Sequence, residues 1–249
     1  MKIVERLVTP YNDVDVWQRA DGYDFEVAGG THAMWSADRI MTGYAWDAIT
    51  AAALLRPGAA PRSVLMLGLG GGTAIRQLRH LLPSARITTV EIDPDMVDLA
   101  RRYMNLDALD VDVVVGDAYV YIAESRATFD VVIDDVYLGA KGDVVRPAAY
   151  TTGIMQQLRA RTTPGGTVLA NLVTGSGHRG VQAQVRRTFQ QAFPSLRVVR
   201  AAKGFNETIV GGNALAATPR LREFDACLTH PRDLQLWQAL HASKLPSLA

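Results

Sequence analysis

Cysteine is almost missing from this chain, because Cys227 is the only one among 249 residues. A single thiol excludes a disulfide within the chain and a zinc site made only of its own thiolates. An excess of charge of one sign is missing too, since 26 basic and 25 acidic residues leave a net charge of +1. The sequence therefore gives no electrostatic reason to expect nucleic acid or a membrane as the main partner.

Long apolar runs are also missing. No run reaches the roughly 18 residues that a membrane-spanning helix needs, and the first residues show no apolar signal segment. We therefore expect a cytoplasmic protein. No group of histidine and acidic residues has the spacing of metal ligands, so no metal site is predicted. With 48% hydrophobic and 20% charged residues, the chain can still bury a sizeable core.

The most informative stretch is the sequence SVLMLGLGGGT at residues 63–73. Its apolar run predicts a buried parallel strand, and the glycines Gly68, Gly70 and Gly72 predict a tight turn after it. Apolar spacing over 71–82 then predicts a helix. Glycines let the backbone approach a ligand closely, so strand, glycine turn and helix together indicate the start of a nucleotide-binding unit.

Glu91 closes the next apolar run, residues 86–91. A carboxylate at that strand end can accept hydrogen bonds from both hydroxyls of a ribose. Thr73 stands where a dinucleotide-binding motif would have its third glycine. At this point the pattern is compatible with NAD, with nucleosides and with S-adenosylmethionine (SAM).

Strands and helices alternate regularly after residue 62. Strands are predicted at about 63–68, 86–91, 111–115, 129–134 and 167–172, followed by an antiparallel hairpin at 196–201 and 207–210. Five parallel strands with crossover helices and a final hairpin predict a doubly wound, mostly parallel α/β sheet of seven strands. The intervening residues are predicted as helices at about 118–125, 147–162 and 178–193, a loop at 135–146 and a helical tail at 220–243.

The first part of the chain has a different pattern. Residues 1–35 alternate in part and contain two hairpin signals, Asp21-Gly22 and Gly29-Gly30, which predict a small antiparallel β element. Residues 36–56 read as a helix with Ser36 as its N-cap. We therefore divide the chain into an N-terminal β element with an entrance helix, 1–56, and a nucleotide-binding domain with a helical tail, 57–249.

Polar residues gather at the predicted strand ends, where doubly wound sheets bind their ligands. Glu91 is expected to hold the ribose, and Asp117 to accept from the adenine amine. Ile92 and Ala118 are expected to enclose the adenine ring. Asp117 also suits the N-cap of the helix that follows it, and the two roles can coexist.

The fourth strand ends in two adjacent carboxylates, Asp134 and Asp135. Successive strand residues point to opposite faces, so only one of the two can face the ligand. We predict that Asp135 is a general base and assign Asp134 to the cofactor site. Tyr137 either lines the acceptor pocket, as a second catalytic residue, or covers the sheet.

These motifs carry a family resemblance. The segment 63–172 resembles the spermidine synthase family, a branch of the class I SAM-dependent methyltransferase fold. The matching text is VLMLGLGGGT at 64–73, VEIDP at 90–94, GDA at 116–118, FDVVIDD at 129–135 and PGG at 164–166. The resemblance implies a Rossmann-like fold with a small N-terminal β element and a cofactor that is SAM or decarboxylated SAM. It also implies that Glu91 and Asp117 contact ribose and adenine.

The chain departs from the family where the acceptor binds. Aminopropyltransferases carry Asp-Ser-Ser-Asp-Pro-x-Gly-Pro after the fourth strand. The first Asp aligns with Asp135, whereas the second falls on Leu138 and both prolines are gone. Since a polyamine has two cationic amines that need acidic partners, this loss argues against polyamine chemistry.

We therefore predict methyl transfer from SAM to a small-molecule acceptor, possibly an amine. Aminopropyl transfer from decarboxylated SAM to an amine is the alternative enzyme reading, and a nucleoside-binding domain without catalysis is the alternative of another class. By analogy with the family, the N-terminal β element is a candidate homodimer surface.

Overall fold

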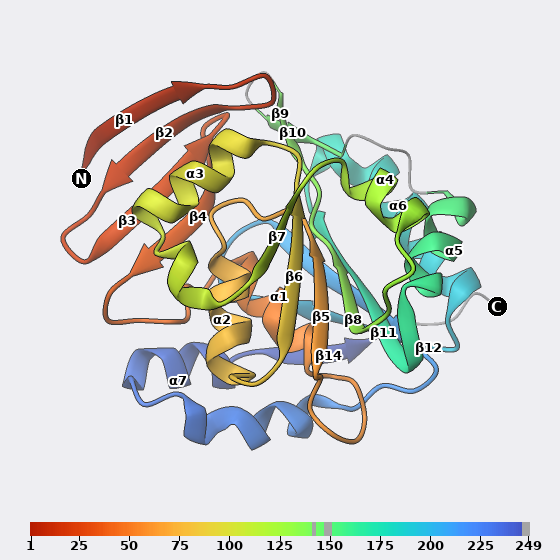
Figure 1. The fold of residues 1–249 in the computed structure, drawn as a ribbon. Helices are drawn as coiled ribbons and strands as arrows, with labels where there is room; N and C mark the ends of the chain where they lie inside the picture. The colour runs from red at the N-terminus through yellow and green to blue at the C-terminus, as the bar shows by residue number, and fades with distance from the viewer. Residues whose placement is uncertain (141–142, 147–150, 246–249) are drawn as a thin grey trace.

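The computed structural model describes residues 1–140, 143–146 and 151–245. A twisted central sheet runs through the molecule, and a smaller antiparallel sheet leans against one end of it (Figure 1). The expected α/β fold with a small N-terminal β element is confirmed. Among the described residues, no helix has the length and apolar character needed to cross a membrane.

The central sheet has eight strands in the order β14-β12-β13-β11-β8-β5-β6-β7. The strands are β5 (Ser63–Leu67), β6 (Arg86–Glu91), β7 (Asp112–Val115), β8 (Phe129–Asp134), β11 (Thr162–Val173), β12 (Ser195–Arg200), β13 (Asn206–Gly212) and β14 (His241–Lys244). β7, β6, β5, β8 and β11 are parallel, whereas β13, β12 and β14 continue the sheet in antiparallel pairs. The carboxyl ends of the five parallel strands therefore meet along one edge of the sheet.

Helices cover both faces of this sheet. They are α1 (Ala45–Ala53), α2 (Thr73–Leu81), α3 (Pro94–Tyr103), α4 (Ala118–Glu124), α5 (Thr152–Ala160), α6 (Arg179–Ala192) and α7 (Pro231–Gln238). Alternate residues of β5 serve the two faces, with Val64 and Met66 packed in the core of α1 to α3. Leu65 and Leu67 pack in the core of α4 to α6. This explains why β5 is an unbroken apolar run.

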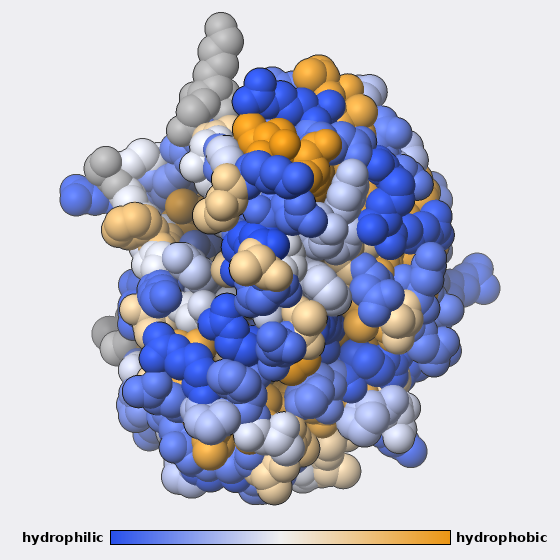
Figure 2. Space-filling view, turned by 90° about the vertical axis from the view of Figure 1, so that its left-hand side faces the viewer, coloured by the Kyte–Doolittle hydropathy of each residue, from blue (hydrophilic) through white to orange (hydrophobic). Residues whose placement is uncertain are grey.

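The N-terminal sheet has four antiparallel strands in sequence order. They are β1 (Lys2–Val8), β2 (Asp13–Gln18), β3 (Gly22–Val27) and β4 (Gly30–Ser36). On the side of the molecule that carries this sheet, polar side chains surround scattered apolar ones (Figure 2). The expected dimer surface here stays a prediction.

The helix expected over 36–56 is wrong in its first half. Ser36 is the last residue of β4, and its hydroxyl donates to Asp21 Oδ2 at 2.8 Å instead of capping a helix. The helix begins only at Ala45, because the Asp47 carboxylate binds the backbone N–H groups of Thr42 (3.0 Å) and Gly43 (2.7 Å) in the preceding bend. α1 then packs against β11, β12 and β13.

Two further expectations need correction. The tail 220–243 is a 3-10 segment (Thr218–Cys227), then α7, then the edge strand β14. The segment 135–146 is not only a loop, because β9 (Leu138–Ala140) and β10 (Asp143–Val145) form a small hairpin within it. The helix expected at 147–162 is observed at Thr152–Ala160, and 147–150 lie outside the described residues.

Candidate functional site

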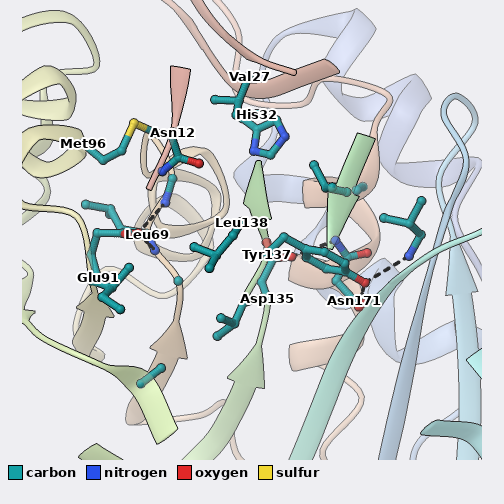
Figure 3. A pocket seen from close by; sticks show the side chains of 18 of the residues that line it. Asn12, Val27, His32, Leu69, Glu91, Met96, Asp135, Tyr137, Leu138 and Asn171 are labelled. Carbon is teal, nitrogen blue, oxygen red and sulfur yellow. Dashed lines mark hydrogen bonds between the residues drawn. The ribbon is translucent and has the colours of Figure 1, made fainter. Parts of the chain in front are cut away.

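A cavity of about 1030 Å³ lies at the carboxyl ends of the parallel strands. Its walls come from the ends of β5, β6, β8 and β11, from the tip of the N-terminal sheet and from the start of α1. In Figure 3, Glu91 and Leu69 lie at one side, Tyr137 and Asn171 at the other, and Asp135 lies between them. The cavity is thus where a doubly wound sheet is expected to bind its ligand.

The glycine turn forms the floor of this cavity. Gly68 and Gly70 line it, and both have positive φ, at 88° and 52°. A Cβ on Gly68 would lie 2.6 Å from the carbonyl oxygen of Asp135, and one on Gly70 would lie 3.2 Å from that of His32. These glycines therefore also let β8 and β4 pack close to the turn. Gly72, expected at the cofactor, caps α2 outside the cavity lining.

Glu91 lines the cavity and also holds the glycine turn. Its Oε2 accepts from the backbone N–H groups of Leu69 (2.8 Å) and Gly70 (3.2 Å). Its Oε1 accepts from the N–H of Asp93 at 3.1 Å. Burial raises the pKa of Glu91, whereas these three hydrogen bonds lower it. Each carboxylate oxygen can accept more than one hydrogen bond, so the side chain retains capacity for ribose hydroxyls.

Asp117 is the N-cap of α4, as one of its two expected roles requires. Its Oδ1 accepts from the N–H groups of Tyr119 (2.7 Å) and Val120 (3.0 Å). Among the described residues, Oδ2 accepts no hydrogen bond, and Asp117 lines the cavity. The cap leaves one oxygen for an adenine amine, and the expected neighbours Ile92 and Ala118 line the same end of the cavity.

Asp134 and Asp135 are separated as their strand positions predict. Asp134 is fully buried outside the cavity lining, and its Oδ1 accepts from Arg146 Nη1 at 2.7 Å. Because Asp134 does not line the cavity, its assignment to the cofactor site has no support in the cavity geometry. A fully buried carboxylate needs a cationic partner, and Arg146 provides it. Arg146, which follows β10, was not predicted from the sequence.

Asp135 faces the cavity. Its Oδ1 accepts from Asn171 Nδ2 at 2.8 Å, and its backbone N–H donates to Leu67 O at 2.9 Å. Burial raises the pKa of Asp135 to about 7, although the Asn171 hydrogen bond and the Arg146 charge both lower it. A carboxyl with this pKa can take up a proton near neutral pH, as a general base must.

Tyr137 lines the cavity, but its hydroxyl is already engaged. The hydroxyl donates to Asn171 O at 2.9 Å and accepts from Val173 N at 3.2 Å. The guanidinium carbon of Arg146 lies 4.7 Å from the centre of the Tyr137 ring. These contacts fix the ring over β11, so Tyr137 combines the two expected roles of lining the pocket and covering the sheet. Its catalytic role stays a prediction.

The sequence analysis missed His32 as a site residue. Phe25 pairs with Ala33 and Glu26 with Thr31, so His32 is the extra residue of a β-bulge on β4. A bulge redirects a side chain, and His32 lines the cavity above Leu138 and Tyr137 (Figure 3). Burial lowers the pKa of His32 to about 4, so the imidazole is neutral at physiological pH. The only sequence signal was the Gly29-Gly30 turn before it.

The site fits a nucleoside with a reactive tail. Glu91 and Asp117 offer acceptor oxygens beside apolar walls, and the glycine turn leads from them to Asp135. Among the described residues, no group of three or more histidine, cysteine or acidic residues could hold a metal ion.

Comparisons with known proteins agree with this arrangement. Residues 47–202 match the family model of the spermine/spermidine synthase domain. The chain belongs to the spermine/spermidine synthase family. A probable polyamine aminopropyl transferase of Bifidobacterium longum is 31% identical over 166 residues, which are 66% of this chain. The chain spans only 36% of the length of that relative.

Solved structures give the same fold. A probable spermidine synthase of Corynebacterium glutamicum matches 98% of this chain and 91% of its own, with a TM-score of 0.75 and 19% identity. The human methyltransferase-like protein 13 in complex with SAH matches 78% of this chain and 93% of its own, with a TM-score of 0.60 and 26% identity. The spermidine synthase match therefore includes the N-terminal sheet.

Proposed function

We propose that this protein transfers the aminopropyl group of decarboxylated SAM to an amine, with Asp135 as the proton acceptor. The observation that carries the proposal is the position of Asp135. Its carboxyl lies between the predicted nucleoside side of the cavity and the side lined by Tyr137 and Asn171, with a pKa raised to about 7. An amine that forms a new N–C bond must lose a proton, and this carboxyl can receive it.

The residues of the chain hold and orient the reactants. The sulfonium donor supplies an electrophilic carbon, whose bond to sulfur breaks with its electron pair retained by sulfur as the amine nitrogen bonds to that carbon. Glu91 and Asp117 are the groups that would hold the ribose and adenine of the donor. Asn171 keeps the Asp135 carboxyl in place through its 2.8 Å hydrogen bond. Catalysis then rests on positioning and on the removal of one proton.

Family membership and the Bifidobacterium longum relative support the aminopropyl reading over the methyl transfer that the sequence suggested. Methyl transfer from SAM remains the second candidate because of one observation. The human structure that holds SAH, the product of methyl transfer, matches 93% of its own chain here at 26% identity. Both candidates use the same nucleoside side and the same base.

Identification of the by-product separates the candidates. The protein is incubated with an amine and with either SAM or decarboxylated SAM. Methylthioadenosine is expected and supports aminopropyl transfer. S-adenosylhomocysteine would instead support methyl transfer and contradict the proposed function. The absence of both products would favour a nucleoside-binding domain without catalysis.

The role of Asp135 is tested by the pH dependence of kcat/KM. Below a pH of about 7 the carboxyl is protonated and cannot accept a proton, so the rate is expected to rise with pH and level off above that value. Asp135→Asn should lower the rate and remove this limb. Asp112→Asn, at the exposed start of β7, is the matched control. An unchanged limb in Asp135→Asn would exclude it as the base.

A further inference from the structure

The part of the cavity on the side of Asp135 away from Glu91 has a lining that differs from that of the nucleoside side. In the strand order β6-β5-β8-β11-β13, Glu91 ends β6 on one side of Asp135, while β11 ends and the antiparallel β13 begins on the other. We call that second side the acceptor chamber, and it is lined by Tyr44, Trp46, Val173, Phe205 and Asn206. Val173 and Asn206 are paired across β11 and β13, which places them together at this edge.

Aromatic and aliphatic groups make the walls of the chamber. The rings of Tyr44 and Trp46 meet edge to face, with their centres 6.4 Å apart at the start of α1. Phe205 is 78% exposed at the rim, although it is a large apolar side chain. An exposed phenyl group at the mouth of a cavity can bury its apolar surface by covering an apolar ligand, which stabilises the complex.

The amide and imidazole side chains in and beside the chamber carry no charge. Asn206 Nδ2 donates to Asn171 Oδ1 at 3.3 Å, and Asn171 Nδ2 donates to Asp135. His32, above the chamber, is neutral because burial lowers its pKa. These groups can orient a ligand, but none supplies the negative charge that a second ammonium needs.

Carboxylates lie elsewhere in the cavity. Among the described residues, those that line it are Glu91, Asp117, Glu124, Asp135 and Asp143. Glu91 and Asp117 belong to the nucleoside side, and Glu124 is exposed at the end of α4. Asp143 is exposed on β10, and its Oδ2 lies 3.1 Å from His178 Nε2. Residues 141–142, 147–150 and 246–249 contain no Asp or Glu in the sequence.

A cation stands near the chamber instead. Lys203 Nζ lies 5.6 Å from the centre of the Tyr44 ring, and the backbone N–H of Lys203 donates to Gly43 O at 2.8 Å. A second ammonium in the chamber would therefore meet like charge as well as apolar walls. Burial of a charge without a partner is strongly unfavourable.

We propose that the acceptor is a monoamine with an uncharged, apolar body, which fills the acceptor chamber while its amino group reaches Asp135. This inference rests on the proposed function. It departs from a diamine acceptor, because the chamber offers one carboxylate, Asp135, where a diamine would need two.

Hexylamine and 1,6-diaminohexane test this directly, because they differ only in the distal amino group. Both are assayed as acceptors with decarboxylated SAM and with SAM, and as ligands by calorimetry on protein saturated with methylthioadenosine. We expect kcat/KM and affinity to favour hexylamine by at least about tenfold. Equal or better use of the diamine would overturn the inference while leaving the proposed function intact.

Calorimetry keeps the two proposals distinguishable. If neither amine is alkylated, the proposed function fails, but the order of the two affinities still decides the acceptor class. If the diamine binds more tightly than hexylamine and Asp143→Asn abolishes this advantage, the distal amine lies at the rim, and the inference is overturned. Binding of neither amine would also overturn it.

A charge reversal provides the complementary test. Lys203→Glu adds a carboxylate beside Tyr44 and is expected to reduce the preference for hexylamine several-fold by improving use of the diamine. Lys2→Glu, on the exposed edge strand β1, makes the same change in net charge away from the cavity and is the control. A preference that shifts equally in both variants would contradict a local effect.

Discussion

Thr73 and Met34 join the start of α2 to the N-terminal sheet through a pair of hydrogen bonds. Thr73 Oγ1 accepts from the backbone N–H of Met34 at 2.9 Å and donates to its carbonyl oxygen at 3.1 Å. Thr73 begins α2 directly after the glycine turn, and Met34 lies on β4. The residue that replaces the third glycine of a dinucleotide motif thus anchors the N-terminal sheet to the nucleoside side of the cavity.

Replacement of Thr73 by Val should separate shape from hydrogen bonding. Val keeps the volume but leaves the N–H and C=O groups of Met34 without this partner, so the free energy of unfolding should fall by about 1–3 kcal/mol. Thr73→Ser keeps the hydroxyl and should lose clearly less. Urea denaturation measures both variants, and an equal loss in the two would mean that the methyl group, not the hydrogen bonds, matters.

The central sheet was predictable because its signals are local. Apolar runs placed β6 at 86–91 and β8 at 129–134 with the bounds that the structure has. The helix over 36–56 failed because its start depends on the bend that Asp47 holds, which small and apolar residues do not reveal. β14 was missed because it pairs with β12, which is far away in the sequence.

Part of the candidate site was predictable from the sequence, because the signals for that part are also local. The strand rule brought Glu91, Asp117 and Asp135 to one cavity. It could not show that Arg146 returns to bind Asp134, nor that a bulge turns His32 into the cavity, because both depend on long-range packing.

Glu91→Gln is expected to affect both the nucleoside and the turn. Gln can accept from only one end, so either the N–H groups of Leu69 and Gly70 or that of Asp93 loses its partner. Nucleoside affinity should fall by about 1–3 kcal/mol, and the free energy of unfolding should fall as well. Calorimetry with methylthioadenosine and thermal unfolding measure the two effects. Unchanged affinity would remove Glu91 from the ribose.

Replacement of Arg146 should affect two carboxylates, Asp134 and Asp135. Arg146→Met leaves the fully buried Asp134 without its cation, which should cost about 3–5 kcal/mol of the free energy of unfolding. Asp134→Asn added to this variant should recover part of that loss. Because the Arg146 charge lowers the pKa of Asp135, Arg146→Met alone should also shift the acid limb of kcat/KM to higher pH. The double variant should shift it less, because it also removes the Asp134 charge, which raises the same pKa. A limb that does not move would show that the charge is screened from Asp135.

Asp135 should make the fold less stable as pH rises. Its pKa is about 7 in the folded protein and near the ordinary value of 3.8 in the unfolded chain. Between these values the unfolded chain has released the proton that the folded protein still holds. The free energy of unfolding therefore decreases with pH across this window, by up to about 1.4 kcal/mol per pH unit from this group.

Asp135→Asn removes this dependence while keeping a group of the same size. The stability of the variant relative to the natural protein should therefore increase between a pH of about 4 and about 7 and stay constant above, where both states of Asp135 are ionised. Urea denaturation at several pH values, with Asp112→Asn as the control, measures the difference. A difference that is constant from pH 4 to 8 would mean that Asp135 is ionised throughout, and the acid limb of kcat/KM would then need another group.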